Sequence, residues 1–543
     1  MSLSLIDAVV VVIYAIGIFS LAQWVSREKA GHQKDTSDYF LASKNLPWWA
    51  IGSSLIAANI SAEQIVGMSG SGYAIGLAIA SYEWMAAATL LIVGKFFLPI
   101  FLKNHIYTMP QFLHRRYGRV LPIIMAIFWL ALYVFVNLTS IIWLGSIAVN
   151  KVAGINQNVA LVILGGFALL YQIKGGLKAV ALTDIVQVTL LVLGGLVVAY
   201  LTLSQIGGDA GVLGGFAKLT EAAPTHFHMI LQKGDPHYID LPGLSVLIGG
   251  MWIANIAYWG FNQYIIQRAL AAKNLDEAQK GVIFAAFLKL LMPVIIVLPG
   301  IAAVMLAPNL LKPDEAYPTM MRLLPPGLLG LVFAALVAAI IASTASKINS
   351  IATIFTLDLY AKFRGERTRA EDDKAESAPE EKHLVLVGRI TAVAAIVIAI
   401  LVARPLVGSS EQAFQFIQEF SGFFTPGITV IFLLGLFWKR ATEAGAIVAA
   451  VTSVLLSTVM KYALPSASLS QGMNDYLTPF INRMGVVFLV SLVLAVIVSL
   501  ATKARPGTDT IDTVDVRYKT STGFNAGALG VILILIALYA TWW

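Results

Sequence analysis

A cluster of polar side chains lies within an apolar stretch near the start of the chain. Asn59, Ser61, Glu63 and Gln64 occur in residues 51–90, which are otherwise mostly apolar and rich in glycine. Polar groups in hydrocarbon cost several kcal/mol each unless they are paired. Irregular backbone at membrane depth persists only where protein or a water-filled cavity covers it. Close helix packing also uses glycine and serine, but it does not need amide and carboxyl groups. We therefore interpret this stretch as part of a binding site.

Two charged residues lie deep within later apolar runs. Glu83 follows the glycine-rich stretch, and Lys289 precedes a long apolar run that leaves its ammonium group no short path to water. The two side chains could pair simply to hold helices together. Alternatively, they could bind a polyol together with Gln64, Asn255 and Gln418, because carboxylate, amide and ammonium groups supply the mixed donors and acceptors that hydroxyl groups need.

Aromatic residues flank these polar positions along the chain. They are Tyr82, Trp84, Tyr258, Trp259, Phe414 and Phe416. A pyranose has an apolar face as well as hydroxyl groups, so rings beside amides suit a sugar. Aromatic side chains at membrane depth also serve packing. Together with the amides, they favour a sugar-like solute over an ion channel.

The composition indicates a polytopic membrane protein. Of 543 residues, 58% are hydrophobic and 12% are charged, whereas soluble domains carry about 25% charged residues. The net charge of +7 does not indicate nucleic-acid binding, because the cations lie in short loops. No cysteine occurs, which excludes thiol chemistry. The histidines lie in loops or at span edges, and no signalling domain is attached, which argues against a membrane-embedded enzyme or sensor.

Fourteen apolar runs are long enough to cross about 30 Å of hydrocarbon. They are 5–24, 48–74, 77–102, 120–150, 157–173, 179–204, 244–267, 281–307, 327–361, 384–403, 411–438, 441–464, 480–502 and 523–543. Lysine and arginine gather in the odd-numbered loops, which places both termini outside. The first run precedes its cations, Arg27 and Lys29, and is expected to be an uncleaved span.

A faint internal repeat predicts how the helices are arranged. Ala58-Asn59-Ile60 and Ala254-Asn255-Ile256 lie at matching depths in the second and seventh runs, which enter the membrane from opposite sides. An interrupted, polar first helix in each of two five-helix halves is what an inverted-repeat transporter requires. The expected parts are an N-terminal helix and loop (1–47), the first repeat (48–204), an extracellular loop (205–243), the second, inverted repeat (244–438) and three C-terminal peripheral helices (439–543).

Residues that could serve a cation leave two alternatives open. Asp184 lies about a turn inside the cytoplasmic edge of its span, either as a helix-start acid favoured by the dipole or as an acid on a cation exit path. Ser343 lies among small residues, which serve close packing or, with carbonyl groups freed at Ala57 and Ile60, could bind sodium.

Other ionisable residues in or near the spans are expected to lie outside the site. Lys95, Lys347 and Asp358 are interpreted as structural or interfacial. Glu63 and Glu419 neighbour candidate site residues, but helical spacing predicts that they point elsewhere.

Several motifs occur together along nearly the whole chain: Asn59-Ile60-Ser61-Ala62-Glu63-Gln64, Gly67 to Ala74, Ser81-Tyr82-Glu83-Trp84, Tyr258 to Tyr264, Lys289, Asn349 to Asp358 and Gln415 to Gly422. With these motifs the chain closely resembles the solute:sodium symporter family, and within it the bacterial sodium/galactose (sodium/glucose) cotransporters. The resemblance implies an all-α, leucine-transporter-like core formed by spans two to eleven. It also implies alternating access and a place in the bacterial inner (plasma) membrane.

The resemblance further implies roles for individual residues. The residues implied to hold the sugar are Gln64, Glu83, Asn255, Lys289 and Gln418, with Tyr258 stacked on the ring. The implied gate residues are Asn59 and Trp259 on the cytoplasmic side and Met68, Tyr82 and Phe414 on the outer side. The implied sodium site comprises the carbonyl groups of Ala57, Ile60 and Ala339, the position of Ala342 and the hydroxyl of Ser343, with Asp184 in sodium release.

Two positions depart from the sugar-branch pattern. Relatives often have a serine where this chain has Ala342, so either the sodium affinity is lower or a water or Thr344 replaces the lost oxygen. Ala86 likewise stands where some relatives place a serine near the sugar.

The expected function is sodium-coupled import of a hexose such as galactose or glucose, with sodium as the co-transported ion. The alternative is a sodium symporter of the same fold for another polyol or small polar solute. No intramembrane arginine lies near the site, which argues against a carboxylate solute. No catalytic residues, nucleic-acid binding or obligate protein partner are expected.

Overall fold

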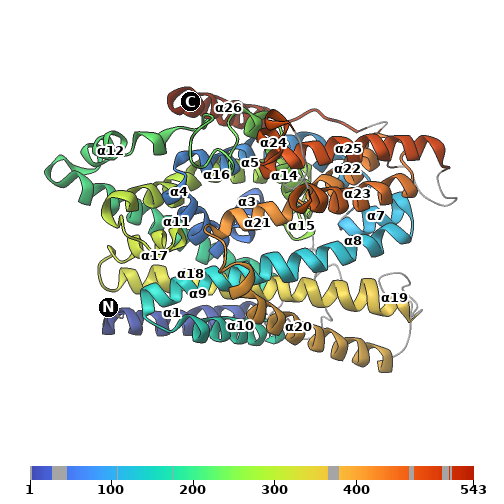
Figure 1. Cartoon of the computed structure of the whole chain (residues 1–543). Helices are drawn as coiled ribbons and strands as arrows, with labels where there is room; N and C mark the ends of the chain where they lie inside the picture. The colour runs from blue at the N-terminus through green and yellow to red at the C-terminus, as the bar shows by residue number, and fades with distance from the viewer. Residues whose placement is uncertain are drawn as a thin grey trace.

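Apolar helices that run side by side form nearly all of the structure (Figure 1). The computed structural model describes residues 3–26, 46–106, 108–174, 177–364, 378–463, 470–503, 511, 513 and 516–543, without the side chains of 19, 22–26, 172–184 and 378–382. Within these ranges nine helices are long and apolar enough to cross a membrane, or ten if one pair bent by 45° is a single span. The described residues form no strand, which confirms the all-α class. Fourteen crossing helices stay a prediction.

The helices follow the predicted runs closely. The first part contains α1 (Leu5–Ser26), α3 (Trp48–Asn59), α4 (Ser69–Ala74), α5 (Ser81–Ile92), α6 (Leu98–Lys103), α7 (Met109–Tyr117), α8 (Val120–Ala131), α9 (Thr139–Ala153), α10 (Gln157–Lys174), α11 (Leu177–Gly207) and α12 (Gly211–Ala222). The middle contains α13 (Leu244–Ile248), α14 (Gly250–Phe261), α15 (Gln263–Leu270), α16 (Leu275–Leu306), α17 (Ala316–Met321), α18 (Leu328–Thr353), α19 (Ala361–Phe363) and α20 (Ala378–Leu406). The last part contains α21 (Ala413–Ser421), α22 (Thr425–Phe437), α23 (Glu443–Tyr462), α24 (Gln471–Leu477), α25 (Phe480–Ala501) and α26 (Thr522–Trp542).

The second predicted span is interrupted at its polar cluster. Helix α3 ends at Asn59, and the backbone of Ile60 is extended, with φ −71° and ψ 108°. The chain then resumes as a wide π-helical turn, η2 (Glu63–Met68), which leads into α4. This break frees backbone carbonyl groups beside the polar side chains, as the sequence predicts.

The seventh predicted span is interrupted at a different place from the expected one. Asn255 lies within the regular helix α14, where its amide donates to the Met251 carbonyl oxygen at 3.1 Å. The break occurs at Asn262, whose extended backbone separates α14 from α15. The Asn262 side chain accepts a hydrogen bond from the Tyr133 hydroxyl at 3.2 Å, which holds this junction. Both spans are interrupted, while the inverted symmetry and the proposed domain boundaries stay predictions.

Glycines let α4 approach α16 closely. A Cβ atom added at Gly72 would lie 2.8 Å from the Val297 carbonyl oxygen, and one at Gly300 would lie 2.1 Å from the Ser69 carbonyl oxygen. Neither position has room for a side chain. The glycines on this side of the polar cluster therefore serve packing, which is the alternative that the sequence also allowed.

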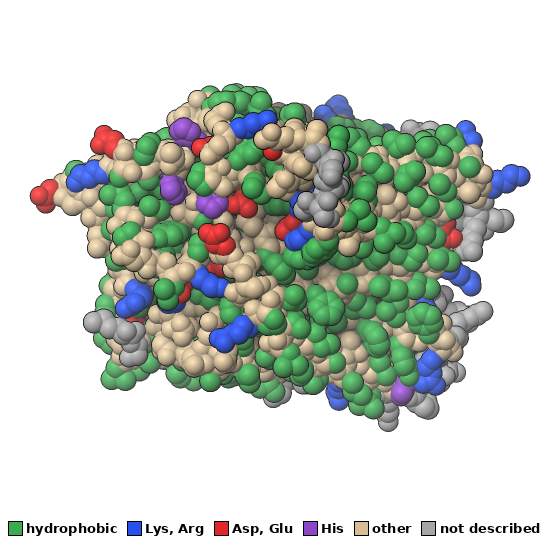
Figure 2. Space-filling model, in the orientation of Figure 1, with side chains coloured by type: hydrophobic (Ala, Val, Ile, Leu, Met, Phe, Trp, Pro, Cys, Tyr) green, Lys and Arg blue, Asp and Glu red, His purple; other side chains and the backbone are tan. Residues whose placement is uncertain are grey.

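The outer surface is apolar, as expected for contact with lipid. Figure 2 shows hydrophobic side chains over much of the visible face, above all in its right half, while charged side chains lie at both ends and across part of the left half. Helix α20 contributes exposed Val385, Ile390 and Leu401. Both termini lie toward the same end of the molecule (Figure 1), and their predicted place outside stays a prediction.

Candidate functional site

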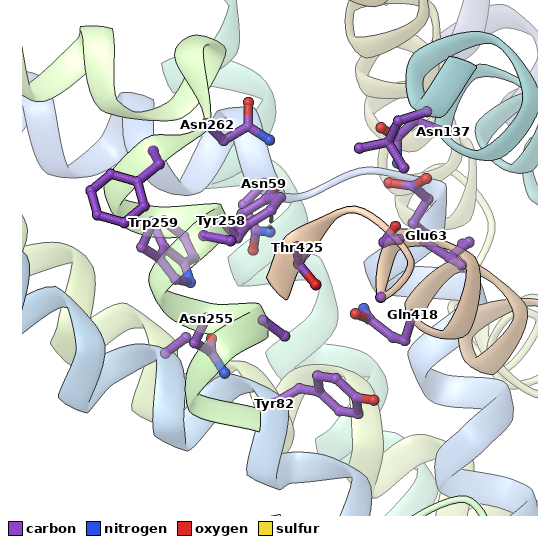
Figure 3. Close-up of a pocket in the computed structure, with 18 of the residues that line it drawn as sticks. Asn59, Glu63, Tyr82, Asn137, Asn255, Tyr258, Trp259, Asn262, Gln418 and Thr425 are labelled. Carbon is purple, nitrogen blue, oxygen red and sulfur yellow. Dashed lines mark hydrogen bonds between the residues drawn. The ribbon is translucent and has the colours of Figure 1, made fainter. Parts of the chain in front are cut away.

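A pocket lies between the break after α3 and helices α5, α14, α16 and α21. Its lining contains every residue predicted to bind the solute: Gln64, Glu83, Asn255, Tyr258, Lys289 and Gln418. Figure 3 shows Tyr258 and Trp259 on one side of this space and Glu63 and Gln418 on the opposite side. The fold therefore brings together residues that are far apart in the sequence.

Lys289 is the centre of a buried polar network in this pocket. Its ammonium group lies 2.6 Å from a carboxylate oxygen of Glu83 and also donates to the Asn59 side chain. It lies 5.0 Å from the ring centre of Trp259, within the range of a cation–π interaction. Lys289 is 1% exposed and Glu83 is 2% exposed. The ion pair that the sequence allowed is present, and it faces the pocket.

A chain of hydroxyl and amide groups extends from this network. The Asn59 amide donates to the Tyr258 hydroxyl at 3.0 Å, and the Tyr264 hydroxyl donates to the same oxygen at 2.8 Å. Because two donors hold the Tyr258 hydroxyl, the ring has a fixed orientation beside the pocket. Tyr258 also packs edge-on against Trp259, with ring centres 5.2 Å apart.

Amide groups remain available to a solute. The carbonyl oxygen of the Gln64 side chain is buried and has no hydrogen-bond partner among the described residues. The Asn255 amide nitrogen is engaged within its own helix, while its side chain still lines the pocket. Figure 3 shows the Gln418 amide directed into the pocket. Buried polar atoms without partners are costly, so hydroxyl groups of a bound solute would stabilise this arrangement.

Two of the three expected outer gate residues lie at the pocket. Tyr82 and Phe414 pack edge-on with ring centres 5.2 Å apart, and both line the pocket. Met68 is fully buried within the hydrophobic core and does not line the pocket. The role in the outer gate that the resemblance implies for Met68 stays a prediction.

A second, smaller pocket lies between α3, α11, α15 and α18. Its lining contains all five residues predicted for sodium: Ala57, Ile60, Ala339, Ala342 and Ser343. The Ser343 hydroxyl donates to the Ile340 carbonyl oxygen at 3.0 Å, which leaves its oxygen lone pairs available. Hydroxyl and carbonyl oxygens are the ligands that hard cations prefer, so the lining fits sodium as a transported substrate.

Two further residues of α18, Thr344 and Lys347, differ in how they relate to this second pocket. Thr344 is buried, donates to the Ile340 carbonyl oxygen at 2.6 Å and does not line the pocket, so it does not replace the missing serine. Lys347 lines the pocket, and its interpretation as structural or interfacial stays a prediction. Asp184 lies on α11, but its side chain is outside the described residues.

Comparison with known proteins identifies the family. A sequence model of the "sodium:solute symporter family" matches residues 39–453. The chain is 48% identical to a protein of Vibrio parahaemolyticus named "sodium/glucose cotransporter", covering 100% of this chain and 99% of that protein. It is 33% identical to the "sodium/myo-inositol cotransporter 2" of Homo sapiens, covering 83% of this chain and 69% of that protein. This chain belongs to the sodium:solute symporter family.

Solved structures show that the symporter's fold is shared more widely. A sodium-coupled sialic acid symporter in an outward-open state superposes with a TM-score of 0.73 at 22% identity, covering 92% of this chain and 99% of that chain. A nucleobase-cation-symport-1 family transporter superposes with a TM-score of 0.53 at 12% identity, covering 91% of this chain and 99% of that chain. At these identities the likeness concerns the fold alone.

Membership in the family confirms several predictions. The symporter is a sodium-coupled, multi-pass membrane transporter and not an enzyme. Family membership does not by itself identify the solute, because the relatives include proteins named for glucose and for myo-inositol.

The structure adds Glu63 to the residues that line the solute pocket. Helical spacing predicts that Glu63 points elsewhere, but this is wrong, since the break at Ile60 and the π-helical turn after it change the direction of the side chain. Figure 3 shows Glu63 beside Asn137, which comes from the π-helical turn η5 (Leu132–Leu138). An acid in an apolar run is itself a signal that the sequence contained.

Three other charged residues lie away from the solute pocket, as expected. Glu419 pairs with Lys461 at 2.8 Å and with Arg483 at 2.5 Å. Asp358 pairs with Lys362 at 3.7 Å, and Lys95 lies beside the ring of Phe96.

Proposed function

We propose that this symporter imports a hexose, such as galactose or glucose, together with sodium by alternating access. The observation that supports it is the convergence of an ion pair, three amides and two aromatic rings on one pocket. Glu83 and Lys289 supply a strong acceptor and a strong donor at fixed positions. The amides of Gln64, Asn255 and Gln418 can both donate and accept, as sugar hydroxyls require.

The two pockets share one structural element, the break after α3. Ile60 lies in the sodium pocket, and Gln64, in the next turn of the chain, lies in the solute pocket. Sodium bound to freed carbonyl groups would order this segment and thereby place Gln64 for the sugar. Coupling of this kind requires only that each ligand stabilises the same backbone conformation.

The membrane potential supplies part of the driving force. One sodium charge moving inward gains about 2.3 kcal/mol per 100 mV, before any concentration difference is counted. Because the ion and the solute share an ordered segment, sodium entry down its gradient would carry the sugar inward against its own gradient.

A cyclic polyol is the second candidate solute. The relatives include proteins named for myo-inositol transport, and a cyclitol presents hydroxyl groups around its ring that the same amides can bind. The pocket contains Ala86 beside Glu83 and adds no hydroxyl group there.

The test is uptake of radiolabelled galactose, glucose and myo-inositol into proteoliposomes with an inward sodium gradient. Replacement of sodium by potassium should abolish accumulation. Lys289→Ala should remove uptake, because it deletes the donor to Glu83 and to the solute. Lys280→Ala is the matched control on the same helix, because the Lys280 side chain is 42% exposed and pairs with Asp276 at the helix start.

The outcomes separate the candidates. Sodium-dependent accumulation of a hexose that fails only in the Lys289 variant supports the proposal. Accumulation of myo-inositol alone would favour the cyclic polyol. Hexose uptake that ignores sodium would contradict the coupling.

A further inference from the structure

A buried ammonium group lies in the wall of the sodium pocket. Lys347 is 5% exposed and lines the pocket together with Ser343, one turn earlier on α18. Its ammonium nitrogen has no hydrogen-bond partner among the described residues. A lysine buried to this degree without a hydrogen bond is uncommon, because the transfer of its charge from water is costly unless other groups compensate.

The groups around Lys347 compensate for its charge. The ammonium nitrogen lies 3.6 Å from the ring centre of Tyr264 and 4.9 Å from that of Tyr133. Glu63 interacts with it electrostatically, and one Glu63 carboxyl oxygen is also buried without a hydrogen bond. Two ring faces and a carboxylate are an environment for a cation.

Lys347 and Glu63 lie on the wall that separates the two pockets. Lys347 lines the sodium pocket, Glu63 lines the solute pocket, and Tyr264 lines both. Arg268 is the other cation at the sodium pocket, and its guanidinium group donates to the Ser54 hydroxyl at 2.6 Å. Arg268 therefore has hydrogen-bond partners of its own, whereas the Lys347 ammonium lies against ring faces with no hydrogen bond among the described residues.

We propose that Lys347 is a resident cation that sets the sodium affinity of this pocket, with Glu63 as the counter-charge that keeps the pocket able to bind sodium at all. The proposal rests on the proposed sodium-coupled function and adds a residue to it. A fixed positive charge beside a cation pocket weakens the binding of a second cation, since the two charges repel in a medium of low dielectric constant. Ala342 also has no side-chain oxygen to offer sodium, which should lower the sodium affinity further.

The test is equilibrium binding of radiolabelled sodium to the purified full-length protein without any solute. Lys347→Met keeps an unbranched side chain of similar length and removes the charge. We expect this variant to bind sodium at about a tenfold lower concentration than the parent protein. Lys347→Arg keeps the charge and should bind sodium weakly, as the parent does.

A second variant tests the counter-charge and does not depend on the first variant folding. Glu63→Gln leaves the ammonium group uncompensated, so sodium binding should weaken by about tenfold. In the double variant, Lys347→Met with Glu63→Gln, the two opposite effects should largely cancel.

Several results would overturn the inference. Unchanged or weaker sodium binding in a monodisperse Lys347→Met protein would show that the ammonium group does not oppose sodium. Unchanged sodium binding in Glu63→Gln would show that the Glu63 carboxylate does not offset the charge of Lys347 at this pocket. Hexose uptake is measured separately with the parent protein, so failure of the proposed solute would leave the result on sodium affinity intact.

Discussion

At the scale of single residues, the buried pair of Lys289 and Glu83 serves both structure and binding. The two charges lie 2.6 Å apart with almost no exposure. An ion pair in this position is weak evidence for stability by itself, because desolvation offsets the attraction. Its place in the pocket gives the pair a second use, since the Glu83 carboxylate and the Lys289 ammonium keep bonding capacity for hydroxyl groups.

Glu83→Gln should separate these two uses. It leaves the Lys289 charge buried without its carboxylate, which costs roughly 3–5 kcal/mol of stability in pairs of this kind. We expect a lower thermal unfolding temperature in detergent and loss of solute uptake. The double variant with Lys289→Met should regain stability and still fail to transport.

Comparing the single and double variants distinguishes a structural role of the ion pair from a role in solute binding. Recovery of uptake in the double variant would mean that the pair only holds the helices together. An unchanged unfolding temperature in Glu83→Gln would mean that the remaining partner, Asn59, is sufficient for Lys289.

At the scale of elements, the sequence predicts where helices occur better than how their turns are wound. The polar cluster after Ile56 indicated a break, and the chain does unwind at Ile60. The π-helical winding of η2 has no signature in the spacing of apolar residues, because it depends on packing against helices far away in the chain. The prediction for Glu63 assumed α-helical spacing and failed for this reason.

Asp314 connects the turn that carries it to helices α4 and α21. It lies in the short turn η8 (Pro313–Glu315), between α16 and α17, and outside the predicted spans. One of its carboxyl oxygens accepts from the Ala413 amide at 3.2 Å, at the start of α21. The other lies buried against Gly70 of α4 without a hydrogen-bond partner among the described residues.

Stability should therefore depend on pH through Asp314. Burial raises the pKa of the Asp314 carboxyl to about 7 from an ordinary value of 3.8, against the opposing effects of the Ala413 amide and Lys312. Between these two values the folded protein holds a proton that the unfolded chain has released. The free energy of unfolding should then fall as the pH rises through this window.

Asp314→Asn is the matched variant, because it keeps the shape and cannot ionise. We expect the thermal unfolding temperature of the parent protein to fall between pH 5 and pH 7, and that of the variant to fall clearly less. Equal losses in the two proteins would assign the effect to other groups. The measurement is thermal unfolding in detergent at both pH values.

At the scale of the whole molecule, the arrangement explains why two weak sequence signals pointed to one mechanism. Ala58-Asn59-Ile60 lies at the end of α3, with Ile60 just past it, and Ala254-Asn255-Ile256 lies within α14; the side chains of Asn59 and Asn255 both line the solute pocket. Composition and apolar runs were sufficient to predict an all-helical membrane protein. The solute was not predictable to the same degree, because galactose, glucose and a cyclitol differ by hydroxyl positions that amide groups of similar reach can all satisfy.

The orientation of the molecule in the membrane can be tested with single introduced cysteines. No native cysteine has to be replaced first, because the chain contains none. The charge bias of the loops predicts that both termini face outside, and both lie at one end of the molecule (Figure 1). In intact cells, a membrane-impermeant maleimide should label Trp543→Cys and Lys233→Cys, since Trp543 and Lys233 are exposed. Lys439→Cys, also exposed but in a predicted inner loop, should react only after lysis. The reverse labelling pattern would invert the orientation and make the transporter's Tyr82 and Phe414 side the inner one.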